Sequence, residues 1–217
     1  LRDLPSEIAH LVNMTFLDCS RNLISGLPPE MGHMQLETLL MSDNKLFSLP
    51  AVVHEIGANH IRVDAVGNEV SGVPSLKVLD FARNSVINLP SALGHMQELE
   101  VLRINSNKIR HLSHVIENLQ NLQLFDARDN SIPALPVEIG KCTALTELYL
   151  DNNELNAVPG SIGNLTNLTR LGIANNQITS FPLSMSNLTL ERLDYEDNNV
   201  TVPCDFIREK GASIMLK

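Results

Sequence analysis

The sequence predicts an α/β solenoid: one stack of coils with a curved parallel β-sheet of about nine strands on its concave side. Three observations predict it. An Asn recurs at a nearly fixed interval, apolar residues keep fixed offsets from that Asn, and apolar and polar residues alternate just before it. The intervals are 22, 24, 16, 23, 23, 23, 23 and 22 residues, a period typical of solenoids. The nine Asn are Asn22, Asn44, Asn68, Asn84, Asn107, Asn130, Asn153, Asn176 and Asn198.

The coil from Leu145 to Leu165 shows the repeating pattern most completely. Residues around Leu148 and Leu150 alternate between apolar and polar, as in a strand whose successive side chains point to opposite faces. The part from Val158 to Leu165 is predicted to return on the convex side as a loop or short helix. Each coil buries its apolar residues only against its neighbours, so a single coil should not fold alone.

The pattern LxxLxLxxNxLxxLPxxIGxL in this coil resembles the leucine-rich repeat in its 23-residue form. The resemblance extends over nearly the whole chain, and the subtype is similar to the cytosolic Ras-group repeats of Scribble, Erbin and related plant intracellular proteins. It implies a mechanical role for the nine Asn, whose side chains would bond to the backbone of the adjacent coil. It also implies a closing segment with a short capping helix.

The domain organisation is predicted to be a single leucine-rich-repeat domain. The first coil lacks its strand and its Asn, so we expect the sequence to be a fragment of a longer chain. The domain spans residues 1–217, with a partial repeat at 1–13, nine repeats at 14–203 and a C-terminal cap at 204–217.

One interval departs strongly from the period. Only 16 residues separate Asn68 from Asn84, so about seven residues of the usual return segment are missing around Pro74. Two interpretations stay open: a tolerated deletion on the convex side, or a local kink that shapes a partner site.

Composition excludes several functional classes. A net charge of −9 and a pI near 5.2 argue against nucleic-acid or anionic-membrane surfaces, which need clustered Lys and Arg. The acidity favours a basic partner, although a merely solvated acidic surface is the alternative. No run of 18 apolar residues exists, so no membrane span is predicted.

Cysteine usage indicates a reducing compartment, and we therefore expect a cytoplasmic protein. Cys19 and Cys142 stand where other coils carry large apolar residues, and Cys204 lies in the closing segment. None belongs to a paired cluster of the kind that caps secreted solenoids.

The sequence contains no catalytic or cofactor motif. Its Gly residues do not form a phosphate-binding loop, and its three Cys occur singly, without zinc-site spacing. His111 and His114 form an H-x-x-H pair, a weak pattern more consistent with an exposed loop than with a metal site. The chain is predicted to be no enzyme and to bind no cofactor or metal.

The informative residues are those predicted on the concave face, four, two and one positions before each Asn. Five of the nine residues in the first of these columns are Asp, which is depleted in strands, so strand propensity does not explain them. They form either an acidic recognition strip with a few Arg, or lateral ion pairs without function. Tyr149, flanked by Glu147 and Asp151, is the best single candidate. The candidate partner-binding residues are Asp18, Arg21, Asp64, Asp80, Arg83, Arg103, Asp126, Arg128, Asp129, Glu147, Tyr149, Asp151, Asp194, Glu196 and Asp197.

These observations predict a non-enzymatic protein-interaction module, a scaffold or regulator in intracellular signalling, that binds a protein partner on its acidic concave face. The charge favours a basic partner, and the family resemblance makes a small-GTPase-type partner plausible. Two alternatives stay open: the repeat region of a larger kinase, GTPase or immune-receptor-type protein, and a structural subunit of a large assembly.

Overall fold

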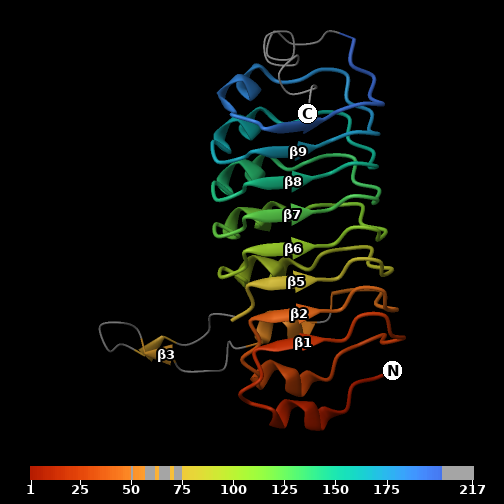
Figure 1. Cartoon of the computed structure of the whole chain (residues 1–217), viewed down its shortest axis with the longest axis vertical. Coiled ribbons are helices and arrows are strands. Elements are labelled where there is room, and N and C mark those ends of the chain that lie inside the picture. The colour runs from red at the N-terminus through yellow and green to blue at the C-terminus, as the bar shows by residue number, and fades with distance from the viewer. Residues whose placement is uncertain (50, 57–61, 64–68, 71–74, 202–217) are drawn as a thin grey trace.

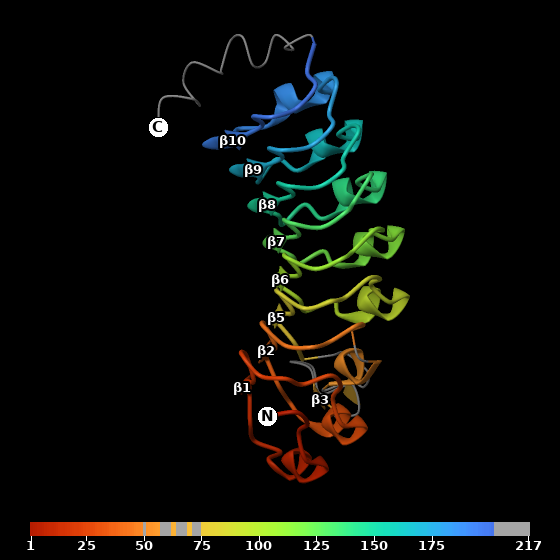
Figure 2. The ribbon, with the colours of Figure 1, turned by 90° about the vertical axis from the view of Figure 1, so that its right-hand side faces the viewer.

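The computed structural model describes residues 1–49, 51–56, 62–63, 69–70 and 75–201. They form a stack of coils with an eight-stranded parallel sheet along one side, and Figure 2 shows these strands on the inner side of a gently curved stack. The strands, in sheet order, are β1 (Phe16–Asp18), β2 (Thr38–Leu40), β5 (Val78–Asp80), β6 (Val101–Arg103), β7 (Leu124–Asp126), β8 (Glu147–Tyr149), β9 (Arg170–Gly172) and β10 (Arg192–Asp194).

Short 3₁₀ helices of five residues form the outer side, where the sequence predicts loops or short helices (Figure 2). Most begin after a Pro with φ near −70°, a residue that lacks an N–H and is set for the first turn. Ser113 replaces this Pro once, and its hydroxyl accepts from the N–H of Val115 at 3.5 Å. The helices are η1 (Ser6–His10), η2 (Pro29–His33), η3 (Ala51–Glu55), η4 (Ser91–His95), η5 (His114–Asn118), η6 (Val137–Lys141), η7 (Gly160–Asn164) and η8 (Leu183–Asn187).

One continuous, mainly aliphatic core runs through the stack between the sheet and the outer helices. Cys19 and Cys142 are free thiols buried in it, at the core positions predicted from the sequence. Burial raises the pKa of the Cys142 thiol to about 12, so the group stays protonated at neutral pH. Cys204 and the cap predicted at 204–217 lie outside the described residues.

The Asn of each coil ties that coil to the one before it. Asn153 donates to the carbonyl of Leu150 in its own coil and to that of Ala127 in the preceding coil, both at 3.0 Å. Its Oδ1 accepts from the N–H of Ile132, also at 3.0 Å. The same three kinds of bond are made by Asn44, Asn84, Asn107, Asn130, Asn176 and Asn198.

Two of the nine Asn differ. Asn22, in the first complete coil, donates to the carbonyls of Cys19 and Ser20 within its own coil. Asn68 lies outside the described residues.

The residue before each described Asn turns the chain at the end of the strand. It adopts the left-handed conformation, with φ between 52° and 58°, in which Asn and Asp are several-fold enriched among non-glycine residues. The acidic and amide residues of this column therefore have a backbone reason. They include Asp129 and Asp197, which are among the predicted partner-binding residues.

The segment around the short interval is an insertion, which corrects the prediction of a shortened coil. β2 pairs directly with β5, and Asn84 bonds to the backbone of Met41 and Leu46 in the coil of Asn44, each at 3.0 Å. Those two Asn are 40 residues apart, so one 23-residue coil leaves about 17 residues over.

Part of this insertion forms a separate antiparallel pair, β3 (Arg62–Val63) with β4 (Glu69–Val70). Figure 1 shows β3 beside the stack, away from the strands of the sheet. The sheet consequently has eight strands where about nine were predicted. Asp64 and Pro74 lie outside the described residues. Within the described ranges, no helix is long and apolar enough to cross a membrane.

Candidate functional site

The concave face is hollowed over β6 to β10, with a volume of about 1650 Å³. We call this region the concave hollow. Side chains of five neighbouring strands and their corners line it, so residues far apart in the sequence meet there. Its polar lining includes Arg103, Asp126, Arg128, Asp129, Tyr149, Asp151, Arg170, Arg192, Asp194 and Glu196.

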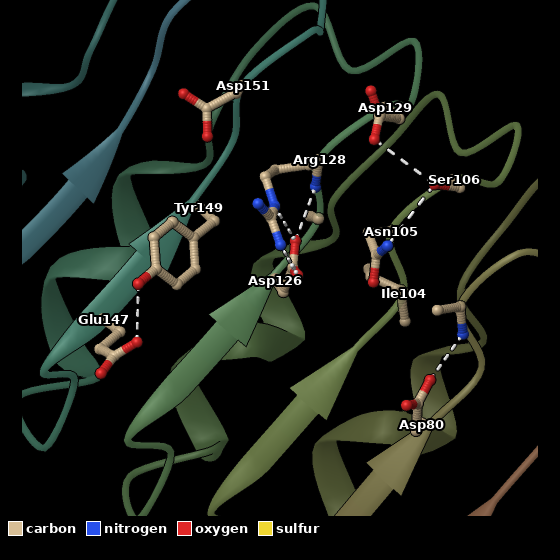
Figure 3. Close-up of polar contacts among 12 residues, drawn as sticks. Asp80, Ile104, Asn105, Ser106, Asp126, Arg128, Asp129, Glu147, Tyr149 and Asp151 are labelled. Atoms are coloured by element: carbon tan, nitrogen blue, oxygen red, sulfur yellow. Dashed lines mark hydrogen bonds and ion pairs between the residues drawn. The ribbon is translucent and has the colours of Figure 1, made fainter. Parts of the chain in front are cut away.

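Arg128 and Asp126 form a charged pair in the hollow (Figure 3). The Arg128 guanidinium donates to both Asp126 carboxylate oxygens, at 2.9 and 2.7 Å. The backbone N–H of Arg128 also donates to Asp126, at 3.2 Å. Only 5% of Asp126 is exposed. Hydrogen bonding to Asp126 raises the pKa of the Arg128 guanidinium. A bidentate pair of this kind fixes the plane of the guanidinium.

Tyr149 is held from both sides. The Arg128 guanidinium carbon lies 5.0 Å from the centre of the Tyr149 ring, within cation–π range. The Tyr149 hydroxyl donates to Glu147 at 2.7 Å, and Arg170 donates to the other Glu147 oxygen at 3.1 Å. Burial, followed by the Glu147 carboxylate, raises the pKa of Tyr149, so the phenol stays neutral. The result is a row of fixed side chains that continues from Arg128 and Tyr149 through Glu147 to Arg170. Figure 3 shows its first three members.

The Asp column has a structural role that sequence reasoning missed. Asp18, Asp80 and Asp126 each accept a hydrogen bond from the N–H two residues later, at 2.8, 2.9 and 3.2 Å. An Asp side chain that bonds to the backbone two residues on is an Asx turn. Asp at these strand ends is therefore accounted for by the turn. The signal was available in the sequence, because these Asp stand just before the corner.

Gly172 and Asp151 replace this arrangement in one coil. β9 carries Gly172 where other strands carry Asp, and Asp151 of the preceding coil accepts from the Ala174 N–H at 2.9 Å instead. A Cβ at Gly172 would lie against the Asp151 carboxylate, 2.9 Å from its carbon. Only Gly leaves room for this arrangement.

The predicted residues divide into two groups. The concave hollow brings together Arg103, Asp126, Arg128, Asp129, Tyr149, Asp151, Asp194 and Glu196, with Glu147 bonded to Tyr149. Five others do not line it: Asp18, Arg21, Asp80 and Arg83 belong to coils nearer the N-terminus, and Asp197 lies at a corner. Asp64 lies outside the described residues.

Arg170 and Arg192 line the hollow, and sequence reasoning missed them. Each lies six residues before its Asn, and the period-two alternation that selects the positions four and two before it also selects this one. The columns chosen from the sequence did not include the position six residues before each Asn.

Ion pairs compensate part of the charge on this face. Arg83 pairs with Asp43 of the neighbouring coil at 3.3 Å, which is a lateral pair of the predicted kind. Arg128 instead pairs with Asp126 of its own coil. Arg103 forms no ion pair with any residue that the structure describes. Exposed pairs contribute about 0–1 kcal/mol each to stability, so they explain little of the fold's stability.

We expect Asp80→Asn to stabilise the protein near neutral pH. Burial raises the pKa of the Asp80 carboxyl, so the unfolded chain releases this proton at a lower pH than the folded one. The contribution of Asp80 is therefore fully present below its unfolded pKa of about 3.9 and is lost as pH rises through the folded value. Asn keeps an oxygen for the Ala82 N–H and carries no charge.

Thermal unfolding at about pH 7 and about pH 3 tests this prediction. The variant should unfold at a higher temperature than the parent at the higher pH, with the difference shrinking at the lower pH. An equal gain at both values would contradict the assignment to charge.

No cluster of three or more His, Cys, Asp or Glu with metal-binding geometry exists among the residues with described positions. His111 and His114 are both exposed. The side chains that line the hollow supply aromatic, cationic and acidic groups for contact with a ligand.

The family description "Leucine Rich repeats (2 copies)" matches residues 143–188. The plant peptide hormone receptor RGFR1, solved in complex with RGF2, is 26% identical with a TM-score of 0.73, over 90% of this chain and 30% of that one. The Arabidopsis receptor kinase HAESA, solved with the peptide hormone IDA and the co-receptor SERK1, is 26% identical with a TM-score of 0.74, over 90% and 32%.

A bacterial protein shares the same fold. The functional domain of InlJ from Listeria monocytogenes is 22% identical with a TM-score of 0.72, over 93% of this chain and 38% of that one. This chain spans about a third of the length of these solved chains. The coil pattern, the Asn bonds between coils, the family match and the shared fold agree: residues 143–188 match leucine-rich repeats, and the chain has the leucine-rich-repeat fold.

Proposed function

We propose that this chain is a non-enzymatic interaction module that binds a protein or peptide partner in the concave hollow. Leucine-rich-repeat domains are commonly protein-interaction modules. The observation that carries the proposal is the fixed row of Arg128, Tyr149 and Glu147 inside a hollow of about 1650 Å³. RGFR1 and HAESA, which share the fold, were both solved with bound peptides, which supports a peptide or protein as the ligand class.

The chemistry of this row suits protein recognition. Tyr and Arg are enriched among residues that dominate binding energy at interfaces. Tyr149 and Arg128 are already held by Glu147 and Asp126, so binding immobilises few additional rotamers and loses less entropy. Arg103, which has no ion-pair partner among the described residues, is available for a carboxylate of the partner.

We also propose that the module acts as a cytoplasmic scaffold or regulator in signalling. The Ras-group resemblance supports this role, and a small-GTPase-type partner is one candidate that it suggests. The identity of the partner distinguishes a cytoplasmic scaffold or regulator from a receptor ectodomain. Recovery of a cytoplasmic signalling protein would support it, and recovery of a secreted peptide would overturn it.

The site is tested with Arg103→Ala/Tyr149→Ala, which alters the hollow and leaves the Asp126 turn intact. The matched control is Val137→Ala/Leu183→Ala, which removes side chains that are 63% and 82% exposed on η6 and η8 of the outer side. Partners captured from native lysate are identified by mass spectrometry, and their affinities for the three proteins are measured at low and high salt.

The hollow variant should weaken binding at least ~10-fold and the control should not, because loss of a central Tyr typically removes about 2 kcal/mol or more. Binding should also weaken at high salt, since charged groups surround the site. A partner that binds the hollow variant as well as the parent, yet loses affinity for the outer-side control, would place the interface on the convex side.

A further inference from the structure

The coil of β9 has two small residues, Gly172 and Ala174, at concave-face positions where the neighbouring coils have larger ones. In the register of the sheet, Gly172 pairs with Tyr149 of β8 and with Asp194 of β10. At the next inward position, Ala174 takes the place that Asp151 and Glu196 hold in the neighbouring coils. The Asp151 carboxylate lies over Gly172, and Ala174 lines the concave hollow beside it; we call this place, between the side chains of the two neighbouring coils, the β9 notch.

The Asp151 carboxylate lies in the β9 notch, and the positive charge of Arg128 acts on it only from beyond ion-pair distance. One of its oxygens accepts from the Ala174 N–H, and Asp151 makes no ion pair with any residue in the described part of the chain. Asp194, the nearest acid on the far side, is already bonded to Arg192 at 2.8 Å. Burial, with added repulsion from Asp194, raises the pKa of Asp151. A half-buried carboxylate in this setting is stabilised when a cation approaches it.

Tyr149 gives the β9 notch an aromatic wall. Its neighbour on one side is Asp126 with the bound Arg128, and its neighbour on the other side is Gly172, over which the Asp151 carboxylate lies. Lys and Arg carry apolar stems that pack on such surfaces while the charged head stays at a polar group. An aromatic wall beside an unpaired carboxylate matches that combination.

We propose that the β9 notch receives one Lys or Arg side chain of a protein partner, with its stem along Tyr149 and its cationic head at Asp151. This inference rests on the proposed function of the concave hollow and specifies the partner chemistry at one point within it. The observations that carry it are the charge complementarity at Asp151, whose carboxylate lies over Gly172, and the small Ala174 side chain beside it in the lining of the concave hollow.

The probe is a library of random-sequence peptides displayed on phage and selected against the folded chain. Selected peptides should share one Lys or Arg at a fixed place. The affinity of one such peptide, and of a version with norleucine at that place, is then measured against the parent and against Asp151→Asn. The substitution keeps an oxygen for the Ala174 N–H and removes only the charge.

In the parent, the norleucine version should bind at least ~10-fold more weakly, because a hydrogen bond to a charged group contributes more than a neutral one. In Asp151→Asn the two peptides should bind nearly equally. The matched control is Asp80→Asn, a half-buried Asp of the same face that does not line the hollow and should leave the preference intact. A second variant, Ala174→Val, should weaken the basic peptide by narrowing the β9 notch.

Three outcomes separate the two proposals. Loss of the basic preference in Asp151→Asn alone supports the inference. Peptides that need Arg103 and Tyr149 but show no preference for Lys or Arg, or keep it in Asp151→Asn, overturn the inference and leave the proposed function standing. Failure to select any peptide that depends on Arg103 and Tyr149 counts against both. Thermal unfolding of each variant shows whether it is folded.

Discussion

Asn153→Ala is expected to lower the free energy of unfolding by about 3 kcal/mol or more. Asn153 is buried, and its side chain satisfies the carbonyls of Ala127 and Leu150 and the N–H of Ile132. Alanine would leave the N–H of Ile132 without a partner, whereas the carbonyls of Ala127 and Leu150 would lose one bond each and keep the bonds from Asn130 and Asn176. An unsatisfied buried group costs about 1–3 kcal/mol and each lost hydrogen bond about 0.5–1.5 kcal/mol, so the sum is large beside a typical domain stability of about 5–15 kcal/mol.

Urea unfolding followed by circular dichroism measures the effect. The matched control is Asn156→Ala in the same coil, an exposed side chain with a single 3.4 Å bond to Pro133, which should change stability by less than ~0.5 kcal/mol. Equal losses in the two variants would show that the corner Asn has no special role.

Gly163→Ala is expected to destabilise the protein by about 3 kcal/mol, at the upper end of the range for overpacking. Gly163 lies in η7 on the outer side, and a Cβ there would lie against the backbone oxygen of Ser184 and only 2.9 Å from its carbonyl carbon. Backbone atoms cannot rotate away as a long side chain can. Relief would require η7 and η8 to separate and open the core between them.

The same helix supplies the control. No atom lies within 4 Å of the position that a Cβ would take at Gly160, so Gly160→Ala should be neutral or slightly stabilising through the unfolded state. Thermal unfolding of the two variants compares one close approach with one open position. Similar melting temperatures would mean that the outer helices can shift apart without loss.

The local design of each coil could be predicted from the sequence. The buried residues Leu148, Leu150 and Cys142 and the corner Asn153 all occupy the places that their offsets predict. These assignments succeed because a side chain's direction within a coil depends on its own few residues and on the alternation of a strand. The absence of long helices from the described part of the chain also follows from the short return segments.

Contacts between coils could be predicted only in part. The lateral pair of Arg170 with Glu147 joins adjacent strands; Glu147 was predicted as a candidate beside Tyr149, whereas Arg170, at the same offset in the next coil, was not. Asp126 was interpreted as a recognition residue, yet its carboxylate forms the turn at Arg128 and orients that guanidinium. The residue type alone does not show whether such an Asp contacts a binding partner or the backbone of its own coil.

The sequence by itself determined that this protein is a stack of coils, which residues face its core and where each coil turns, because those properties repeat with the local pattern. Only the tertiary structure decided which coils are neighbours. It places β2 beside β5, pairs β3 with β4 in a separate sheet, and gathers Arg128, Tyr149 and Asp151 in one hollow. The physical reason is that sheet pairing and side-chain contacts join residues about one coil or more apart, and an insertion changes those neighbours without changing the pattern on either side.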